Sequence, residues 1–135
     1  MACSLGTAAI RLGYSVRYFR TSRLLQALAQ ARQKASYPNL LRSLARTDLL
    51  IMEDWMRDEL SPANAQDILE VLDDRYGQAA IITASQMPVM DWFSQIPNPT
   101  LADAFLDRLI HNAYRIQLIG ESQRKLRAIR SIPTT

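Results

Sequence analysis

Two neighbouring acids are the residues best suited to chemistry. Glu53 and Asp54 directly follow the apolar run Leu49–Met52, which predicts a short strand buried on both faces. Acids at the end of such a strand suit phosphate transfer, because one carboxylate can hold Mg²⁺ through its water shell and the next can orient or deprotonate the attacking water. This is the pattern of a Walker B motif. The alternative is a pair of solvent-exposed acids in a turn.

A second polar group follows another predicted strand. Residues 79–83 (AAIIT) predict a buried strand, and Ser85 and Gln86 come just after it. A hydroxyl or amide at the carboxyl end of a strand can sense a γ-phosphate or position a water molecule, which is the task of a sensor residue in ATPases. The alternative is a polar turn ahead of Pro88.

Arg108 is a candidate for contact with phosphate. It lies with Asp103 and Asp107 on a predicted helix that starts at Thr100 and ends near Tyr114. Two interpretations remain open. An arginine on an acidic helix commonly forms an ordinary ion pair. It can also act as an arginine finger, which stabilises the phosphoryl group transferred in a neighbouring subunit.

Charge is unevenly distributed along the chain. Residues 1–47 contain eight basic residues and no acid, residues 48–107 contain twelve acids and two arginines, and residues 108–135 contain six basic residues and one acid. Such segregation predicts a positive patch that attracts phosphate-rich partners by counterion release. Arg17, Arg20 and Arg23 are the candidates for contact with DNA. The alternative is a mosaic of charged faces that interleave once the chain folds.

Alternating helices and strands must position these residues. We expect helices over residues 2–12, 21–34, 37–46, 62–76 and 100–114, strands over 15–19, 48–52, 79–83 and 115–119, and a helical basic tail from residue 121. Thr21, Ser61 and Thr100 are the expected helix caps. The alternation predicts an α/β fold with a parallel sheet covered by helices. Ligands bind such a sheet at the carboxyl ends of its strands.

The bulk composition sets further limits. A chain of 135 residues predicts one domain. The single cysteine, Cys3, excludes an internal disulfide and zinc-finger spacing, and suits a reducing cytoplasm. No apolar run is long enough to span a membrane. We therefore expect a cytoplasmic protein without a membrane partner.

Five segments carry a family resemblance: LLIMEDW, ILEVLDDRYG, ITASQMPVMDWF, PTLADAFLDRLIHNAYRI and GESQRK. In this order and spacing the chain resembles the IstB-like transposition helper ATPases. These are AAA+ P-loop ATPases encoded beside transposases in bacterial insertion sequences, and they are similar to helicase loaders of the DnaC type. The resemblance runs from about Ala2 to Lys125 of a single domain spanning 1–135, and residues 126–135 form a basic tail.

The resemblance implies a three-layer AAA+ core with a mostly parallel sheet that binds ATP and Mg²⁺. It makes Glu53 and Asp54 the Walker B pair that holds Mg²⁺ and nucleotide, Ser85 the sensor beside them, and Arg108 the finger. Asp54, Ser85 and Arg108 are thereby the expected catalytic residues. Family members assemble into oligomers on DNA and help a partner transposase to choose its target.

The chain departs from the family pattern at three points. Glu53 replaces the usual Asp and is one methylene longer, a change to which Mg²⁺ geometry is sensitive. Met56 stands where a glycine commonly follows the acids and the aromatic residue. No segment matches GxxxxGK[ST], the loop that cradles the β- and γ-phosphates.

The third departure leads to the main functional expectation. We expect that the chain begins just after the P-loop and lacks the first strand of the core. It would then be a truncated helper ATPase with weak ATP binding and impaired catalysis. The alternative is a non-catalytic remnant of a decayed insertion sequence that contacts DNA or protein.

Overall fold

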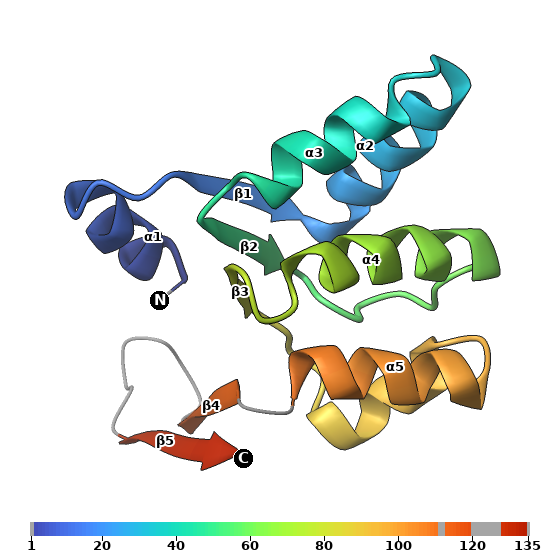
Figure 1. Cartoon of the computed structure of the whole chain (residues 1–135). Helices are drawn as coiled ribbons and strands as arrows, with labels where there is room; N and C mark the ends of the chain where they lie inside the picture. Colours follow the sequence, from blue (N-terminus) through green and yellow to red (C-terminus); the bar gives the residue numbers. More distant parts are fainter. Residues whose placement is uncertain (1, 111–112, 120–127, 135) are drawn as a thin grey trace.

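The computed structural model describes residues 2–110, 113–119 and 128–134 of the chain (Figure 1). The elements follow in the order α1 (Ala2–Arg11), β1 (Val16–Arg20), α2 (Thr21–Gln33), α3 (Tyr37–Ala45), β2 (Leu49–Glu53), α4 (Pro62–Arg75), β3 (Ala80–Thr83), the 3₁₀ helix η1 (Val89–Gln95), α5 (Pro99–Leu109), β4 (Ala113–Ile119) and β5 (Ala128–Thr134). In the part of the chain that is described, no helix has the length and apolar character to cross a membrane.

A three-stranded parallel sheet forms the centre of the fold, as predicted. The strand order is β1-β2-β3, with Val16 opposite Leu49 and Leu49 opposite Ala80. Parallel neighbours require crossover connections, and α2, α3 and α4 provide them (Figure 1). The carboxyl ends of all three strands therefore lie at one edge of the sheet, which we call the carboxyl edge.

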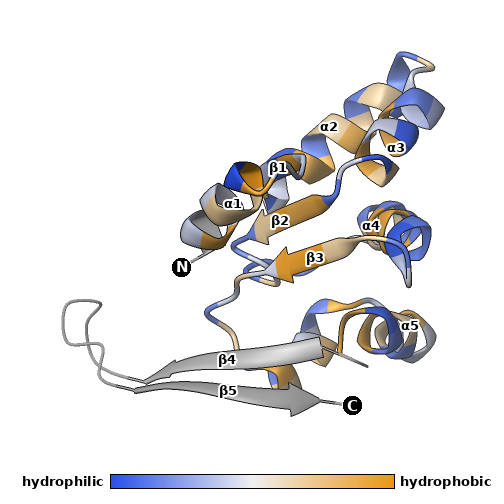
Figure 2. Ribbon diagram, turned by 60° about the vertical axis from the view of Figure 1, so that its left-hand side comes forward, coloured by the Kyte–Doolittle hydropathy of each residue, from blue (hydrophilic) through white to orange (hydrophobic). Residues whose placement is uncertain are grey.

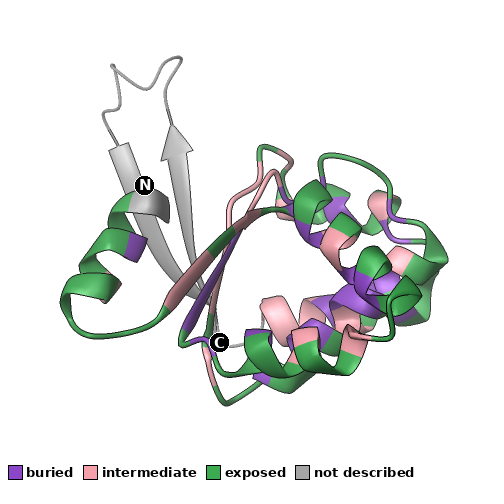
Figure 3. Cartoon of the chain, turned by 90° about the horizontal axis from the view of Figure 1, so that it is seen from above, coloured by how far each residue is buried: buried purple, intermediate pink, exposed green. Residues whose placement is uncertain are grey.

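Helices cover both faces of this sheet, so the fold has three layers (Figure 3). Successive side chains of a strand point to opposite faces. Leu49 and Ile51 of β2 accordingly pack with Ala9 of α1. Leu50 and Met52 belong to the main core beneath α2, α4 and α5. The apolar colouring of β2 in Figure 2 reflects this burial on both sides. The α/β fold class is confirmed.

The last predicted strand and the tail differ from expectation. Residues 115–119 were expected to extend the parallel sheet, but β4 pairs antiparallel with β5 in a separate two-stranded sheet. The tail was expected to be helical, and residues 128–134 form β5 instead. The β-branched residues Ile129, Ile132 and Thr134 favour a strand there.

The helix caps agree with the sequence at one position of three. The hydroxyl of Ser61 accepts a hydrogen bond from the backbone N–H of Asn64 at 3.1 Å and caps α4 as predicted. Asn98, not Thr100, caps α5 through the N–H of Leu101 at 2.8 Å. Helix α5 also ends at Leu109, earlier than predicted. Thr21 is the first residue of α2 and its hydroxyl is used elsewhere, as described below.

A polar cluster joins α2, α3 and α4. Arg32 donates through Nε and Nη2 to one oxygen of Asp67 at 2.9 and 2.6 Å, and the Tyr37 hydroxyl donates to the same oxygen at 3.3 Å. Burial, followed by the carboxylates of Asp67 and Glu70, raises the pKa of Tyr37 to about 12. The phenol therefore remains a neutral hydrogen-bond donor at ordinary pH.

A buried arginine fixes the opposite, amino edge of the sheet. Arg75 is 1% exposed and lies at the end of α4. Its guanidinium donates to the carbonyls of Leu44 at 2.6 Å, Asp48 at 3.1 Å and Ala80 at 2.5 Å. Leu44 lies in the last turn of α3, Asp48 directly precedes β2, and Ala80 is the first residue of β3. One side chain therefore ties four elements together.

Candidate nucleotide site

The two predicted acids lie where β2 reaches the carboxyl edge. Glu53 is the last residue of β2 and is partly buried. Its carbonyl accepts a hydrogen bond from the Thr21 hydroxyl at 2.8 Å, which fixes the end of β2 to the start of α2. Strand alternation places the Glu53 side chain on the same face as Leu49 and Ile51, the face covered by α1.

Helix α1 points its amino end toward the carboxyl edge. Ala9 packs near Leu49 at the start of β2, whereas a Cβ on Gly6 would lie only 3.0 Å from the Ile51 side chain further along β2. Earlier residues of α1 therefore lie progressively closer to the level of Glu53. This face of the edge therefore brings the Glu53 carboxylate and the positive amino end of a helix toward the same level.

The loop after Glu53 is held by buried side chains and an unusual backbone. Asp54 and Met56 adopt positive φ values of 55° and 61°. Trp55 and Met56 are buried in the main core. The left-handed backbone at Met56 gives a physical reason why glycine suits this position, since only glycine adopts such φ values without cost. In this chain burial of the Met56 side chain offsets that cost.

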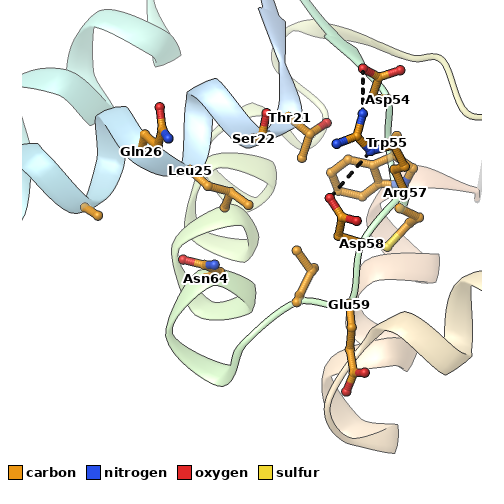
Figure 4. A pocket seen from close by; sticks show the side chains of 13 residues that line it. Thr21, Ser22, Leu25, Gln26, Asp54, Trp55, Arg57, Asp58, Glu59 and Asn64 are labelled. Carbon is orange, nitrogen blue, oxygen red and sulfur yellow. Dashed lines mark ion pairs between the residues drawn. The ribbon is translucent and has the colours of Figure 1, made fainter.

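A hollow of about 340 Å³ lies beside this loop, between it and the first turns of α2 (Figure 4). Its lining includes Asp54, Arg57 and Asp58 from the loop and Thr21 and Ser22 from α2. Arg57 lies between the two carboxylates, with Nη1 3.9 Å from an oxygen of Asp54 and Nε 3.5 Å from one of Asp58. Since α2 covers the face opposite α1, Asp54 is directed away from the Glu53 face.

Ser85, the predicted sensor residue, follows β3 and connects its end to the residues that follow β2. Its hydroxyl donates to the Trp55 carbonyl at 2.5 Å and accepts from the Met87 N–H at 3.1 Å. Beside it, the Trp55 N–H donates to the Ala84 carbonyl at 3.0 Å. Ser85 therefore contacts the loop after Glu53 from the end of β3, and its hydroxyl fixes the backbone next to Asp54.

Arg108 lies away from the acids and Ser85. Its Nε is paired with Asp73 of α4, its Nη1 lies 3.3 Å from Asp107, and its guanidinium is 5.9 Å from the Tyr76 ring centre. Asp73 is two residues before Arg75, which marks the amino edge of the sheet. Arg108 thus forms ion pairs within its own chain, near the amino edge of the sheet and not beside Asp54.

Of the three basic candidates, Arg17 is the second residue of β1, Arg20 is its last, and Arg23 lies in the first turn of α2. Arg17 is half-buried: it donates to the Ser43 hydroxyl at 2.9 Å, and its guanidinium stacks 5.0 Å from the Phe19 ring centre. Arg20 and Arg23 are exposed. We call Arg17, Arg20 and Arg23 the basic patch.

The carboxylates at the carboxyl edge fit a magnesium ion whose other ligands are a substrate phosphate and water molecules. Within the described residues, no three side chains of the His, Cys, Asp and Glu types converge on one point. Mg²⁺ needs only one or two protein carboxylates when a substrate phosphate and waters complete its shell. The partly exposed carboxylates of Glu53 and Asp54 meet that requirement.

Sequence reasoning missed two residues that shape this site. Arg57 pairs with Asp54, and the only sequence signal for this is an arginine three residues after an acid in a turn. Thr21 was expected to cap its own helix, but its hydroxyl reaches 32 residues along the chain to the Glu53 carbonyl. A contact of that range has no local signature.

Comparison with known proteins identifies the family of the chain. Residues 1–131 match the profile of the family described as IstB-like ATP binding protein. An insertion sequence ATP-binding protein of Sinorhizobium fredii is 49% identical over 125 residues, which are 93% of this chain and 51% of that protein. The chain spans about half the length of the curated relatives it matches.

Solved structures show the same fold at low sequence identity. The replication initiator DnaA bound to AMPPCP and single-stranded DNA has a TM-score of 0.65 at 18% identity, over 74% of this chain and 31% of that one. The DnaC helicase loader has a TM-score of 0.59 at 16% identity, over 74% of this chain and 61% of that one. The fold is therefore that of the AAA+ P-loop ATPases. The chain belongs to the family of IstB-like ATP-binding proteins of bacterial insertion sequences.

Proposed function

We propose that this chain supplies the acidic and sensor half of the nucleotide site of a transposition helper ATPase. The observation that carries the proposal is the meeting of Glu53, the Asp54 loop and Ser85 at the carboxyl edge, next to the amino end of α1. An α/β sheet binds its ligands at this edge.

Each residue has a defined task in this proposal. Glu53 holds Mg²⁺ through its water shell on the α1 face, and Asp54 orients or deprotonates the attacking water. Ser85 positions both by fixing the Trp55 carbonyl. Mg²⁺, when bound, would neutralise charge that develops on the phosphates.

Arg108 is proposed to act on a neighbouring copy. Its place near the amino edge puts it away from Glu53 and Asp54 of its own chain, which lie at the carboxyl edge. An arginine finger acts from an adjacent subunit, so the location suits an oligomer in which Arg108 of one copy faces the carboxyl edge of the next. Its pair with Asp73 would hold the guanidinium ready.

Unaided hydrolysis is not expected, because no stretch of the 135 residues matches GxxxxGK[ST]. Without backbone N–H groups and a lysine around the β- and γ-phosphates, the carboxylates have no fixed phosphate to act on. The test is ATP turnover by the 135-residue chain in Mg²⁺. Turnover that depends on Asp54 would overturn this part of the proposal.

A second candidate is a binding module that contacts DNA and a partner transposase without catalysis. The basic patch favours it, since Arg20 and Arg23 are exposed and close in sequence. The names of the relatives, as insertion sequence proteins, support the transposase as partner. Phosphate contacts of this kind release counterions and depend strongly on salt.

Replacing Arg17, Arg20 and Arg23 together by glutamate should strongly weaken, and at low salt not abolish, retardation of a 30-base-pair duplex that the unchanged chain shifts. The slope of log affinity against log salt should fall by about three, one for each lost contact. Gel retardation across a salt series measures both. A charge-matched control replaces the exposed Arg11, Lys34 and Arg46 by glutamate. Equal loss in the control would refute a role for the basic patch.

A further inference from the structure

Arg57 and Asp54 are held close together by a fixed backbone. The Arg57 N–H donates to the Asp54 carbonyl at 3.3 Å, which closes a turn. Gln95 donates through Nε2 to the carbonyls of Met56 at 3.2 Å and Arg57 at 3.4 Å. Trp55 and Met56 are buried in the core, and the side chains of Asp54 and Arg57 both lie on the solvent side of the turn.

This arrangement changes the value of an exposed ion pair. Exposed pairs contribute little when two free side chains must be ordered to form them. Here the turn fixes the backbone of both partners, so only their side chains remain to be ordered when Arg57 meets Asp54. Asp58 shares the guanidinium from the other side at 3.5 Å and keeps it over the hollow (Figure 4).

The ion pair with Arg57 also determines on which face of the sheet the Asp54 carboxylate can bind a cation. Glu53 faces α1, whereas Asp54 and Arg57 line the hollow next to α2. A cation near the α1 face can therefore meet Glu53 directly. It meets Asp54 only if the Asp54 carboxylate turns away from Arg57.

We propose that Arg57 is a latch that holds the Asp54 carboxylate on the α2 side and so weakens binding of a divalent cation at the carboxyl edge. The inference rests on the proposed function, because it concerns the same two acids. It adds a positioning residue that acts on Asp54 through an ion pair. Breaking the pair brings both carboxylates to the cation.

Terbium binding to the intact 135-residue chain tests the latch without ATP. Tb³⁺ prefers oxygen ligands, and its emission is excited by a tryptophan close by, here Trp55 beside Asp54. Arg57→Ala should tighten Tb³⁺ binding about two- to fivefold, the factor that corresponds to breaking one exposed ion pair and so releasing the Asp54 carboxylate. Mg²⁺ should displace the Tb³⁺. Arg57 is 67% exposed, so its removal leaves the core intact.

A double-mutant cycle separates the latch from general charge. The gain from Arg57→Ala should vanish in the Asp54→Asn background, because no carboxylate remains to be released. Arg46→Ala removes an exposed arginine elsewhere and should change Tb³⁺ affinity less than twofold. An equal gain in Arg46→Ala, or a gain that survives Asp54→Asn, would refute the latch.

The same titrations keep the two ideas distinguishable. If Glu53→Gln and Asp54→Asn both leave Tb³⁺ affinity unchanged, the proposed cation site itself is wrong. If these variants weaken binding while Arg57→Ala has no effect, the site stands and the latch is wrong. Raising the salt concentration should shrink the effect of Arg57→Ala, since the charges are exposed and screened.

Discussion

Replacing Trp55 by alanine should lower the free energy of unfolding by about 3–5 kcal/mol. The side chain is 1% exposed and joins three parts of the fold. Its ring stacks on Phe105 of α5 at 6.1 Å between centroids and meets Trp92 of η1 edge-on at 6.1 Å. The loss removes these contacts, leaves a large cavity, and frees the loop that carries Asp54.

Urea unfolding followed by circular dichroism measures the effect. Trp55→Phe is the matched control and should cost about 1–2 kcal/mol, because the ring contacts are largely kept. Among the described residues the indole N–H of Trp55 has no hydrogen-bond partner, so phenylalanine loses no polar contact. A Trp55→Ala variant within 1 kcal/mol of the unchanged chain would contradict the packing described here.

Replacing Arg75 by methionine should lower the free energy of unfolding by about 2–4 kcal/mol, because three charge-assisted hydrogen bonds to backbone carbonyls are lost. Burial lowers the pKa of this guanidinium, and the charge of Asp48 partly opposes that shift. Removing a buried charge returns some of the desolvation cost. The loss should still dominate, since the bonds join α3, α4, β2 and β3 at one point.

Chemical denaturation of Arg75→Met, Arg75→Lys and Arg11→Met measures this contribution. Lysine keeps the charge but cannot span three carbonyls, so its cost should lie between the other two. Arg11 is exposed at the end of α1, and its replacement should change stability by less than about 0.5 kcal/mol. Equal stability of Arg75→Met and Arg11→Met would show that the buried arginine does not hold the amino edge.

Local signals predicted most of the central elements. The apolar run Leu49–Met52 becomes β2, and the Ser61-Pro62 start with Gly77 after the end brackets α4. Strand–helix alternation was sufficient for a parallel sheet, because a parallel connection needs a crossover of this kind. Capping was less predictable: Asn98 and Thr100 both suit a helix start, and their side chains alone do not say which is used.

The C-terminal part was not predictable in this way. Residues 115–119 formed a strand as expected, but a strand pattern does not specify its partner, and β4 pairs with β5.

The candidate site was likewise predictable only in part. The chain order placed Glu53, Asp54 and Ser85 at one edge, whereas the faces to which the two acids turn depend on a positive φ at Asp54 and on Arg57. His111, the single histidine, lies outside the described residues.

ATP turnover by the purified 135-residue chain in the presence of Mg²⁺, compared with its Asp54→Asn variant, tests the proposed loss of unaided hydrolysis. Both proteins should release phosphate at the same background rate, because acids and a sensor hydroxyl are present without a GxxxxGK[ST] loop. Phosphate release by the unchanged chain that Asp54→Asn abolishes would contradict this proposal.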